Sequence, residues 1–182
     1  MSRSWSTTTP SKDIGTTGTP AKGCAAPYLE NSHSMDCVFC HLIRDDSARW
    51  IARDQSTCAF APRMPIAPGH TLVIPTAHIT DIFDAEPSVL AASMVLVRRV
   101  ADGMRSALGA QGVNILNASG PGSEQSVPHL HFHVIPRWGN DNFTTWPAGR
   151  SQHQIDDDPV RLSAMGTAPP VDGGSAHRRA QE

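Results

Sequence analysis

The sequence has no surplus of charge of either sign. Its 182 residues include 15 Lys and Arg against 17 Asp and Glu, which gives a formal net charge of −2 at pH 7. A surface that follows nucleic-acid phosphates needs a clear excess of basic residues. The composition therefore argues against a nucleic-acid polymer as partner.

Long apolar runs are also missing. The longest uninterrupted run, residues 89–92, is broken by Ser93 before residues 94–97, whereas a membrane-spanning helix needs about 20 apolar residues. The first residues do not combine a charged segment, an apolar stretch and a small-residue cleavage site. We therefore expect a soluble, cytoplasmic protein that does not associate with membranes.

Cysteine is scarce. The chain contains only Cys24, Cys37, Cys40 and Cys58, too few for a disulfide scaffold in a chain of this length. Reduced thiols, some of them on a metal, fit this number better.

The two ends of the chain differ in composition from the middle. Residues 1–34 are rich in Ser, Thr, Gly and Pro and show neither a strand nor a helix period. Such a segment cannot bury enough apolar area to offset its ordering entropy, so we expect a disordered extension with Met35 as the natural start. Residues 167–182 are expected to form a disordered tail, which leaves residues 35–166 as one domain.

Within residues 35–166 the hydrophobic pattern changes period in an orderly way. Apolar residues recur at spacings of three and four between Pro87 and Gly109, which predicts a helix ended by the glycine. Short apolar runs predict strands, and no βαβ repeat is present, so we expect an α+β fold with a mostly antiparallel sheet and one main helix. The predicted strands are 58–61, 71–75, 112–117 and 130–136, and a short helix capped by Asp is predicted within 156–166.

The most informative segment is a strand with three histidines. Side chains alternate between the two faces of a strand, so His129, His131 and His133 share one face, spaced roughly 7 Å apart, while the apolar residues between them face the core. Imidazole can act as a nucleophile, a proton carrier or a metal ligand. We therefore expect the three rings to line a functional cleft.

The segment HLHFHVIPR at 129–137 resembles the signature of the histidine triad (HIT) superfamily. CVFC at 37–40, APGHTLVIPTAH at 67–78 and QSVPHLHFHVIPR at 125–137 extend the resemblance in the family's order. It implies an HIT-like fold whose five-stranded, mostly antiparallel sheet continues across a homodimer. It also implies a nucleotide hydrolase or nucleotidyltransferase that cleaves P–N or P–O–P bonds of nucleoside phosphoramidates or dinucleoside polyphosphates through a nucleotidyl-histidine intermediate.

The resemblance also assigns roles to individual residues. It implies that His131 is the nucleophile and that His133 and His70 contact the phosphate or carry protons. A neutral imidazole held at Nδ1 by a backbone carbonyl leaves Nε2 free to attack phosphorus. Gln125 and Ser126, just before the histidine strand, are candidate donors to substrate oxygens.

Cys37 and Cys40 form a C-x-x-C pair, a spacing that lets two thiolates reach one tetrahedral metal. The expected surroundings of a redox pair, a preceding strand in a βαβ unit, are missing. A zinc-containing branch of the HIT superfamily uses such a pair with two histidines, and the matching positions are His78 and His129. The resemblance thus implies a structural zinc site, with a metal-free buried thiol pair as the alternative.

Three positions depart from the pattern typical of the family. Pro62 stands where an acidic residue usually holds the ribose hydroxyls, and the neighbouring Arg63 favours an extra phosphate or another acidic group. Glu124 stands where glycine usually precedes the glutamine. The usual polar nucleotide contact falls at Ala118, so Asn117, one residue earlier, is the candidate in its place, provided that a bulge corrects the offset.

Two other functions remain open at this point. Histidines in H-x-H spacing also suit a metal-dependent hydrolase, although the usual neighbouring carboxylates are missing. A nucleotide-binding module with little turnover would agree with the departures at Pro62, Ala118 and Glu124. The apolar surface of the predicted helix exceeds what one sheet face requires, which favours a homodimer.

Overall fold

The computed structural model describes residues 36–147, 149, 151–153 and 158–167. The predicted disordered ends, including Met35 and Cys24, lie outside these residues except for Thr167. No described helix is long and apolar enough to cross a membrane. The elements are α1 (Val38–Arg44), β1 (Trp50–Arg53), β2 (Thr57–Phe60), β3 (Thr71–Pro75), α2 (Pro87–Leu108), β4 (Gly112–Leu116), β5 (Phe132–Arg137) and α3 (Pro159–Met165).

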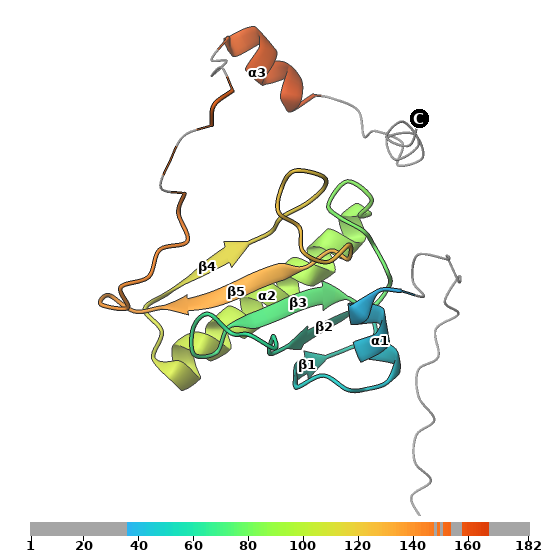
Figure 1. Ribbon diagram of the computed structural model, residues 1–182, viewed down its shortest axis with the longest axis vertical. Helices are drawn as coiled ribbons and strands as arrows, with labels where there is room; N and C mark the ends of the chain where they lie inside the picture. Colours follow the sequence, from blue (N-terminus) through green and yellow to red (C-terminus); the bar gives the residue numbers. More distant parts are fainter. Residues whose placement is uncertain (1–35, 148, 150, 154–157, 168–182) are drawn as a thin grey trace, which may run out of the picture.

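The five strands form one antiparallel sheet in the order β1-β2-β3-β5-β4. Figure 1 shows β5 between β3 and the edge strand β4. The predicted strand 130–136 begins later than expected, because β5 contains only His133, while His129 and His131 lie in the segment that leads into it. This arrangement confirms the predicted α+β fold with a five-stranded antiparallel sheet and one main helix.

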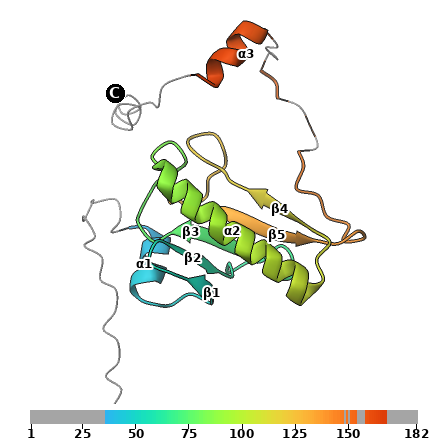
Figure 2. The ribbon, with the colours of Figure 1, turned by 180° about the vertical axis from the view of Figure 1, so that it is seen from behind.

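The long helix α2 covers one face of the sheet (Figure 2). Its N-terminal residue is Pro87, and Gly109 ends it in the left-handed conformation at φ 63°, as the sequence predicts. Buried side chains of α2 pack against the alternate strand residues that face it. This core contains Leu96, Val97, Val100 and Met104 from the helix and Ala59, Val73, Phe132 and Val134 from the sheet.

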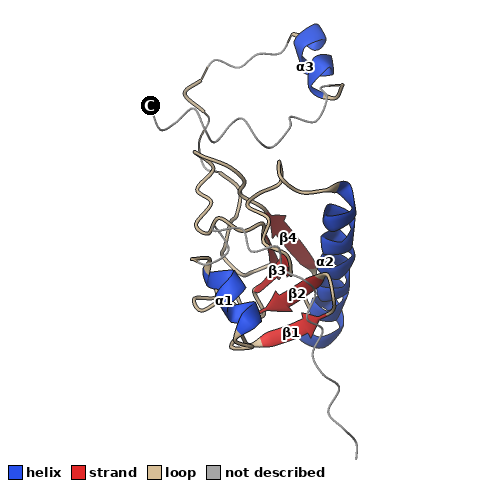
Figure 3. Ribbon diagram, turned by 90° about the vertical axis from the view of Figure 1, so that its right-hand side faces the viewer, coloured by secondary structure: helices blue, strands red, loops and turns tan. Residues whose placement is uncertain are grey.

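The short helix α1 covers the opposite face, so the sheet lies between two helices (Figure 3). Phe39 and Ile43 of α1 pack there with Phe60, Leu72 and Ile74. The alternation of the strands thus divides the core in two, and the histidines belong to the α1 side because His133 pairs with Leu72 across β3 and β5.

The three histidines expected to line a cleft differ in exposure. His129 and His131 are 0% and 2% exposed, and only His133 is partly exposed. Phe39 of α1 lies against both buried rings, with ring centroids 5.7 Å from His129 and 5.5 Å from His131. The sequence does not predict α1, so it does not predict this cover.

The carboxyl-terminal helix α3 lies apart from the sheet in the three ribbon views and buries none of its residues. Asp158 caps it, since its Oδ1 accepts a hydrogen bond from the Val160 backbone N–H at 2.9 Å. The short Asp-capped helix is therefore confirmed.

Candidate functional site

The nucleophile predicted from sequence, His131, is held in one orientation by the backbone just before β5. Its Nδ1 lies 2.7 Å from the carbonyl oxygen of His129. A carbonyl can only accept, so Nδ1 carries the proton and Nε2 keeps its lone pair. His131 thus has the tautomer that nucleophilic attack through Nε2 requires.

His70 and His133 form a second, directed pair. The backbone N–H of Ile66 donates to Nδ1 of His70 at 3.3 Å, which leaves the His70 proton on Nε2. That Nε2–H donates to Nδ1 of His133 at 2.9 Å, and the proton of His133 therefore lies on Nε2. Neighbouring rings thus present opposite functions: His131 has a free lone pair on Nε2, and His133 has an N–H donor.

Burial keeps this pair neutral. It lowers the pKa of His70, and burial together with the charges of His131 and His70 lowers the pKa of His133 to about 4. The rings of His131 and His133 have centroids 5.2 Å apart. At neutral pH His70 and His133 are therefore neutral rings in fixed tautomers.

A glycine allows His70 to enter β3 in this position. Gly69 has φ 82°, and a Cβ built on it would collide with the Leu108 side chain at the end of α2. The His70 backbone N–H closes the preceding turn on the Ala67 carbonyl at 3.1 Å. Any larger residue at position 69 would displace the turn that fixes His70.

Asn117 contacts the histidine strand and leaves little of its amide for other partners. Its Nδ2 donates to the His131 carbonyl at 2.9 Å, and its Oδ1 accepts from the Ser119 hydroxyl at 2.6 Å. Ser119 also accepts from the Ile82 backbone N–H at 3.3 Å. The structure thus shows Asn117 supporting the backbone of the candidate nucleophile, whereas the sequence reading expected a nucleotide contact. Ala118 offers no polar side chain.

Gln125 and Ser126 differ in how accessible their polar groups are to a substrate. The Gln125 amide donates to the carbonyls of Thr80 at 2.7 Å and Val127 at 3.0 Å and accepts from the Gly120 N–H at 2.9 Å. The contact with Thr80 joins the loop 117–128 to the segment after His78, and the other two lie within the loop. Ser126 is exposed, so its hydroxyl is the more accessible of the two candidate donors.

Glu124, at the position where the family usually has glycine, adopts the left-handed conformation with φ 64°. A non-glycine residue enters this region at a cost of roughly 1–2 kcal/mol. The same loop has Gly120 at φ 81° and Gly122 at φ 79°, where no such cost arises.

At the end of the sheet near residues 62 and 70, the chain lacks the acidic residue that is usual in the family. Pro62 is partly buried just after β2, and exposed Arg49 donates to its carbonyl at 3.3 Å. Arg63 is also exposed. Because Phe60 pairs with Leu72, residues 62 and 70 both lie two residues beyond that pair, at the same end of the sheet.

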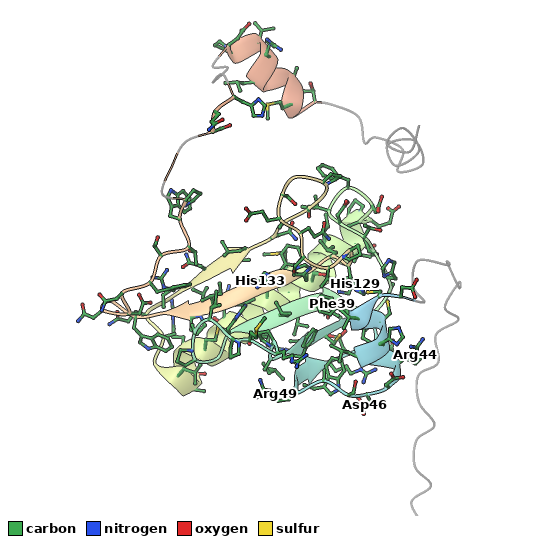
Figure 4. All side chains as sticks on the ribbon, in the orientation of Figure 1. Phe39, Arg44, Asp46, Arg49, His129 and His133 are labelled. Atoms are coloured by element: carbon green, nitrogen blue, oxygen red, sulfur yellow. The ribbon has the colours of Figure 1, made fainter. Side chains whose placement is uncertain are left out.

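The four predicted metal ligands come together. One nitrogen or sulfur atom from each of Cys37, Cys40, His78 and His129 lies within 4.8 Å of all the others. The His129 Nδ1 is 3.4 Å from Cys37 Sγ and 3.6 Å from Cys40 Sγ, and His78 Nδ1 is 3.3 Å from Cys40 Sγ. Figure 4 shows His129 beside Phe39 of α1, the helix that carries Cys40.

These distances fit a tetrahedral zinc site. Zn–S bonds of about 2.3 Å and Zn–N bonds of about 2.0 Å at tetrahedral angles separate sulfur from nitrogen by roughly 3.5 Å. The Nε2–H of His129 donates to the Pro75 carbonyl at 3.1 Å, which turns the Nδ1 lone pair toward the sulfurs. Burial is the main cause that lowers the pKa of His129 to about 4, so the ring is neutral, as a metal ligand must be.

The Cys40 thiol is protonated in the absence of a metal. Burial, followed by the neighbouring Cys37, raises the pKa of Cys40 to about 12. Zinc would displace this proton on binding. Cys58 is a free thiol buried in the sheet and is not one of the four grouped ligands, and burial raises its pKa to about 12 as well.

The structure also contains supports that the sequence reading missed. Phe39 covers His129 and His131, and the carbonyl of Thr80 fixes Gln125. The backbone groups of Ile66 and His129 set the tautomers of His70 and His131. Every residue type has a backbone carbonyl, and every type but proline has a backbone N–H, so the sequence gives no sign of which of these groups form contacts. Only the position of Phe39 between Cys37 and Cys40 could have indicated that its ring lies near the histidines.

Comparison with known proteins agrees with this geometry. A family model described as HIT domain matches residues 44–140. The Bacillus subtilis protein hit is 32% identical over 126 residues, which cover 67% of this chain and 86% of the relative. A solved zinc-bound histidine triad family protein from Mycobacterium smegmatis is 31% identical with a TM-score of 0.59, over 75% of this chain and 99% of that chain.

An antiparallel sheet that carries three alternating histidines beside a Cys2His2 cluster defines the class of protein. The matched region and these relatives show that the chain belongs to the HIT family. It is also similar to an adenylylsulfatase of Arabidopsis thaliana, 33% identical over 107 residues that cover 58% of this chain and 54% of that protein.

Proposed function

We propose that this protein is a nucleotide hydrolase or nucleotidyltransferase that cleaves P–N or P–O–P bonds through a nucleotidyl-His131 intermediate. The observation that carries the proposal is the bond of 2.7 Å from His131 Nδ1 to the His129 carbonyl. It leaves Nε2 unprotonated beside the Nε2–H of His133. In phosphoryl transfer the protein contributes mainly such positioning and the stabilisation of charge.

The reaction has two displacements. Nε2 of His131 forms a bond to the α-phosphorus while the bond to the leaving group breaks, and a proton taken up from solvent passes through His133 to the leaving group. Water then attacks the phosphorus, the bond to Nε2 breaks, and the mononucleotide is released. The proton of that water returns to solvent, so that His133 ends each step as the neutral ring, and His70 keeps this ring oriented through its hydrogen bond of 2.9 Å.

The loop 117–128 has a supporting role and a binding role. Ser126, with its exposed hydroxyl, is the residue that we assign to the phosphate or leaving-group oxygens. Gln125 and Asn117 have amides that already bond to protein groups, so we assign them to positioning the loop and the His131 backbone.

We also propose zinc at Cys37, Cys40, His78 and His129. When bound, zinc supplies a crosslink between α1, the segment after β3 and the histidine strand. The three described cysteines are free thiols, which agrees with the reducing cytoplasmic location that we propose.

The test is a substrate panel assayed with wild type and His131→Ala. It contains adenosine and guanosine 5′-phosphoramidates, a dinucleoside polyphosphate, a nucleoside diphosphate sugar and, because of the similarity to the Arabidopsis protein, adenosine 5′-phosphosulfate. We expect turnover of at least one class and a loss of at least ~100-fold in the variant. His153→Ala is the control, because His153 is exposed and lies outside the cluster.

Two alternatives are separated by the same assay. Tight nucleotide binding without turnover by wild type would favour a binding module, which the departures at Pro62 and Glu124 motivate. A metal-dependent hydrolase would stay folded but inactive without metal. Among the described residues, the one cluster able to hold a metal contains neither His131 nor His133, which speaks against that second alternative.

We further propose a homodimer built on the edge strand β4 and helix α2. Apolar side chains are exposed on both elements: Met94 is 42% exposed and Ile115 is 43% exposed. A groove of about 360 Å³ lies between them, lined in part by Ala101 and Val113. Sedimentation at micromolar concentration should give twice the monomer mass, and a monomer would refute the proposal.

A further inference from the structure

The folding of its loop explains the backbone conformation at position 124 but not the choice of glutamate there. The contacts of Gln125 with Gly120 and Thr80, together with the hydrogen bond of 2.7 Å from the Ser123 hydroxyl to the Gly120 carbonyl, fix the chain on both sides. This arrangement requires the left-handed φ of 64° at position 124. Glycine adopts that φ without strain, whereas glutamate does not.

The loop that carries Glu124 belongs to the histidine site. Asn117 at its base donates to the His131 carbonyl, and Ser126, two residues after Glu124, has the exposed hydroxyl. The loop joins β4 to the beginning of β5, where Figure 4 labels His129. Glu124 is therefore an exposed residue of the loop that supports the His131 backbone and carries Ser126.

The charge of Glu124 is not balanced by its neighbours in sequence or across the loop contact. Glu124 is exposed. Neither its own loop, residues 117–128, nor the segment 79–86 to which Gln125 ties it contains a lysine or an arginine. A carboxylate in this setting repels an anion and attracts a cation.

We propose that Glu124 determines leaving-group specificity, favouring nucleoside phosphoramidates whose amine leaving group bears a positive charge over substrates with an anionic leaving group. The inference rests on the proposed function. The bond from His131 Nε2 to phosphorus forms, the P–N bond breaks and the leaving nitrogen takes its proton through His133. The separate ammonium of the leaving group keeps its proton and pairs with the Glu124 carboxylate.

The experiment compares three adenosine 5′-phosphoramidates that differ only in the amine: 1,2-diaminoethane, propylamine and β-alanine. These leaving groups are cationic, neutral and anionic away from the reacting nitrogen. For wild type we expect kcat/KM to fall in that order. In Glu124→Gln the ratio between the cationic and the anionic substrate should fall by roughly tenfold, because one full charge is removed at short range.

Glu124→Gly separates charge from backbone strain. It should change the substrate ratio as Glu124→Gln does, but it alone should raise the melting temperature, since only glycine relieves the left-handed φ. Glu86→Gln is the matched control for an exposed carboxylate outside the loop and should leave the ratio unchanged.

The outcomes distinguish this inference from the proposed function. A substrate ratio unchanged in Glu124→Gln, or a wild-type preference for the β-alanine derivative, would overturn the role of Glu124 while leaving the nucleotide hydrolase intact. Absence of turnover by wild type on all three substrates and on the wider panel would overturn both.

Discussion

The carbonyl oxygen of His129 lies 2.7 Å from Nδ1 of His131. One residue thus joins two sites, because the His129 ring faces Cys37 and Cys40 while its backbone fixes the tautomer of His131. A change that moves His129 must therefore disturb the proposed nucleophile. The metal site and the histidine chemistry are linked through a single backbone group.

This link predicts that loss of a zinc ligand impairs both stability and activity. Cys40→Ser should bind well under one zinc per chain and lose several kcal/mol of unfolding free energy, since the metal crosslinks three segments. Metal analysis and thermal melts measure both effects. Cys58→Ala, which changes a buried thiol outside the cluster, should keep its zinc. Full zinc content in Cys40→Ser would contradict the assignment.

Asn117→Ala is expected to slow the reaction with little effect on substrate binding. The variant loses the hydrogen bond to the His131 carbonyl, worth about 1 kcal/mol, so kcat should fall roughly fivefold while KM changes little. Steady-state kinetics measure the two constants. Asn140→Ala, at an exposed asparagine, is the control. A variant with a raised KM and an unchanged kcat would instead show that Asn117 contacts substrate.

Gly69→Ala should disrupt the histidine pair. The substituted residue would have an unfavourable φ of 82° and a Cβ that collides with Leu108, and we expect a loss of about 1–3 kcal/mol. Gly103→Ala is the matched control, because a Cβ at Gly103 in α2 meets nothing within 4 Å. In a helix that change should stabilise by up to about 1 kcal/mol. Equal melting temperatures for the two variants would contradict the tight-turn explanation.

The neutral state of His133 predicts a pH dependence of stability. Its pKa in the folded protein, lowered mainly by burial, is about 4 against an ordinary value of 6.5. The unfolded chain therefore binds the proton first as the pH falls, and the stability that neutral His133 contributes, fully present above pH 6.5, is lost between pH 6.5 and 4.

His133→Asn removes this titration but retains an acceptor for His70. The difference in unfolding free energy between wild type and variant should shrink with falling pH by about 0.7 kcal/mol per pH unit, half of the full value of about 1.4 because His133 is partly exposed. Urea titrations from pH 7 to 5 measure the slope. Parallel pH profiles for the two proteins would show that His133 is not held neutral by the fold.

The sequence predicts the parts of the fold with strong periodic signals. The helix between Pro87 and Gly109 has many apolar repeats and a glycine stop, and β3 is a continuous apolar run. The short elements α1 and β1 were not predicted. The helix α1 has no side-chain cap, and β1 is a short edge strand with a bulge; both depend on tertiary packing that local sequence does not encode.

The site shows the same division. Residue types and spacing are enough to select the three histidines and the four candidate metal ligands, because that chemistry belongs to side chains. Residue types and spacing do not predict the directions of the hydrogen bonds, since these depend on the Ile66 N–H and the His129 carbonyl. The polar loop was predicted to contact substrate through Gln125, but that amide is directed to backbone groups that follow from the packing of segment 79–86.

The most direct test of the proposed mechanism is to detect the covalent intermediate. Wild-type protein mixed with an adenosine 5′-phosphoramidate is quenched in alkali, which preserves the acid-labile bond between histidine and phosphorus, and its peptides are analysed by mass spectrometry. We expect an adenylyl group on His131 that forms and decays at the rate of turnover. Turnover without an adduct on this residue, or an adduct on His133 instead, would contradict the central role of His131.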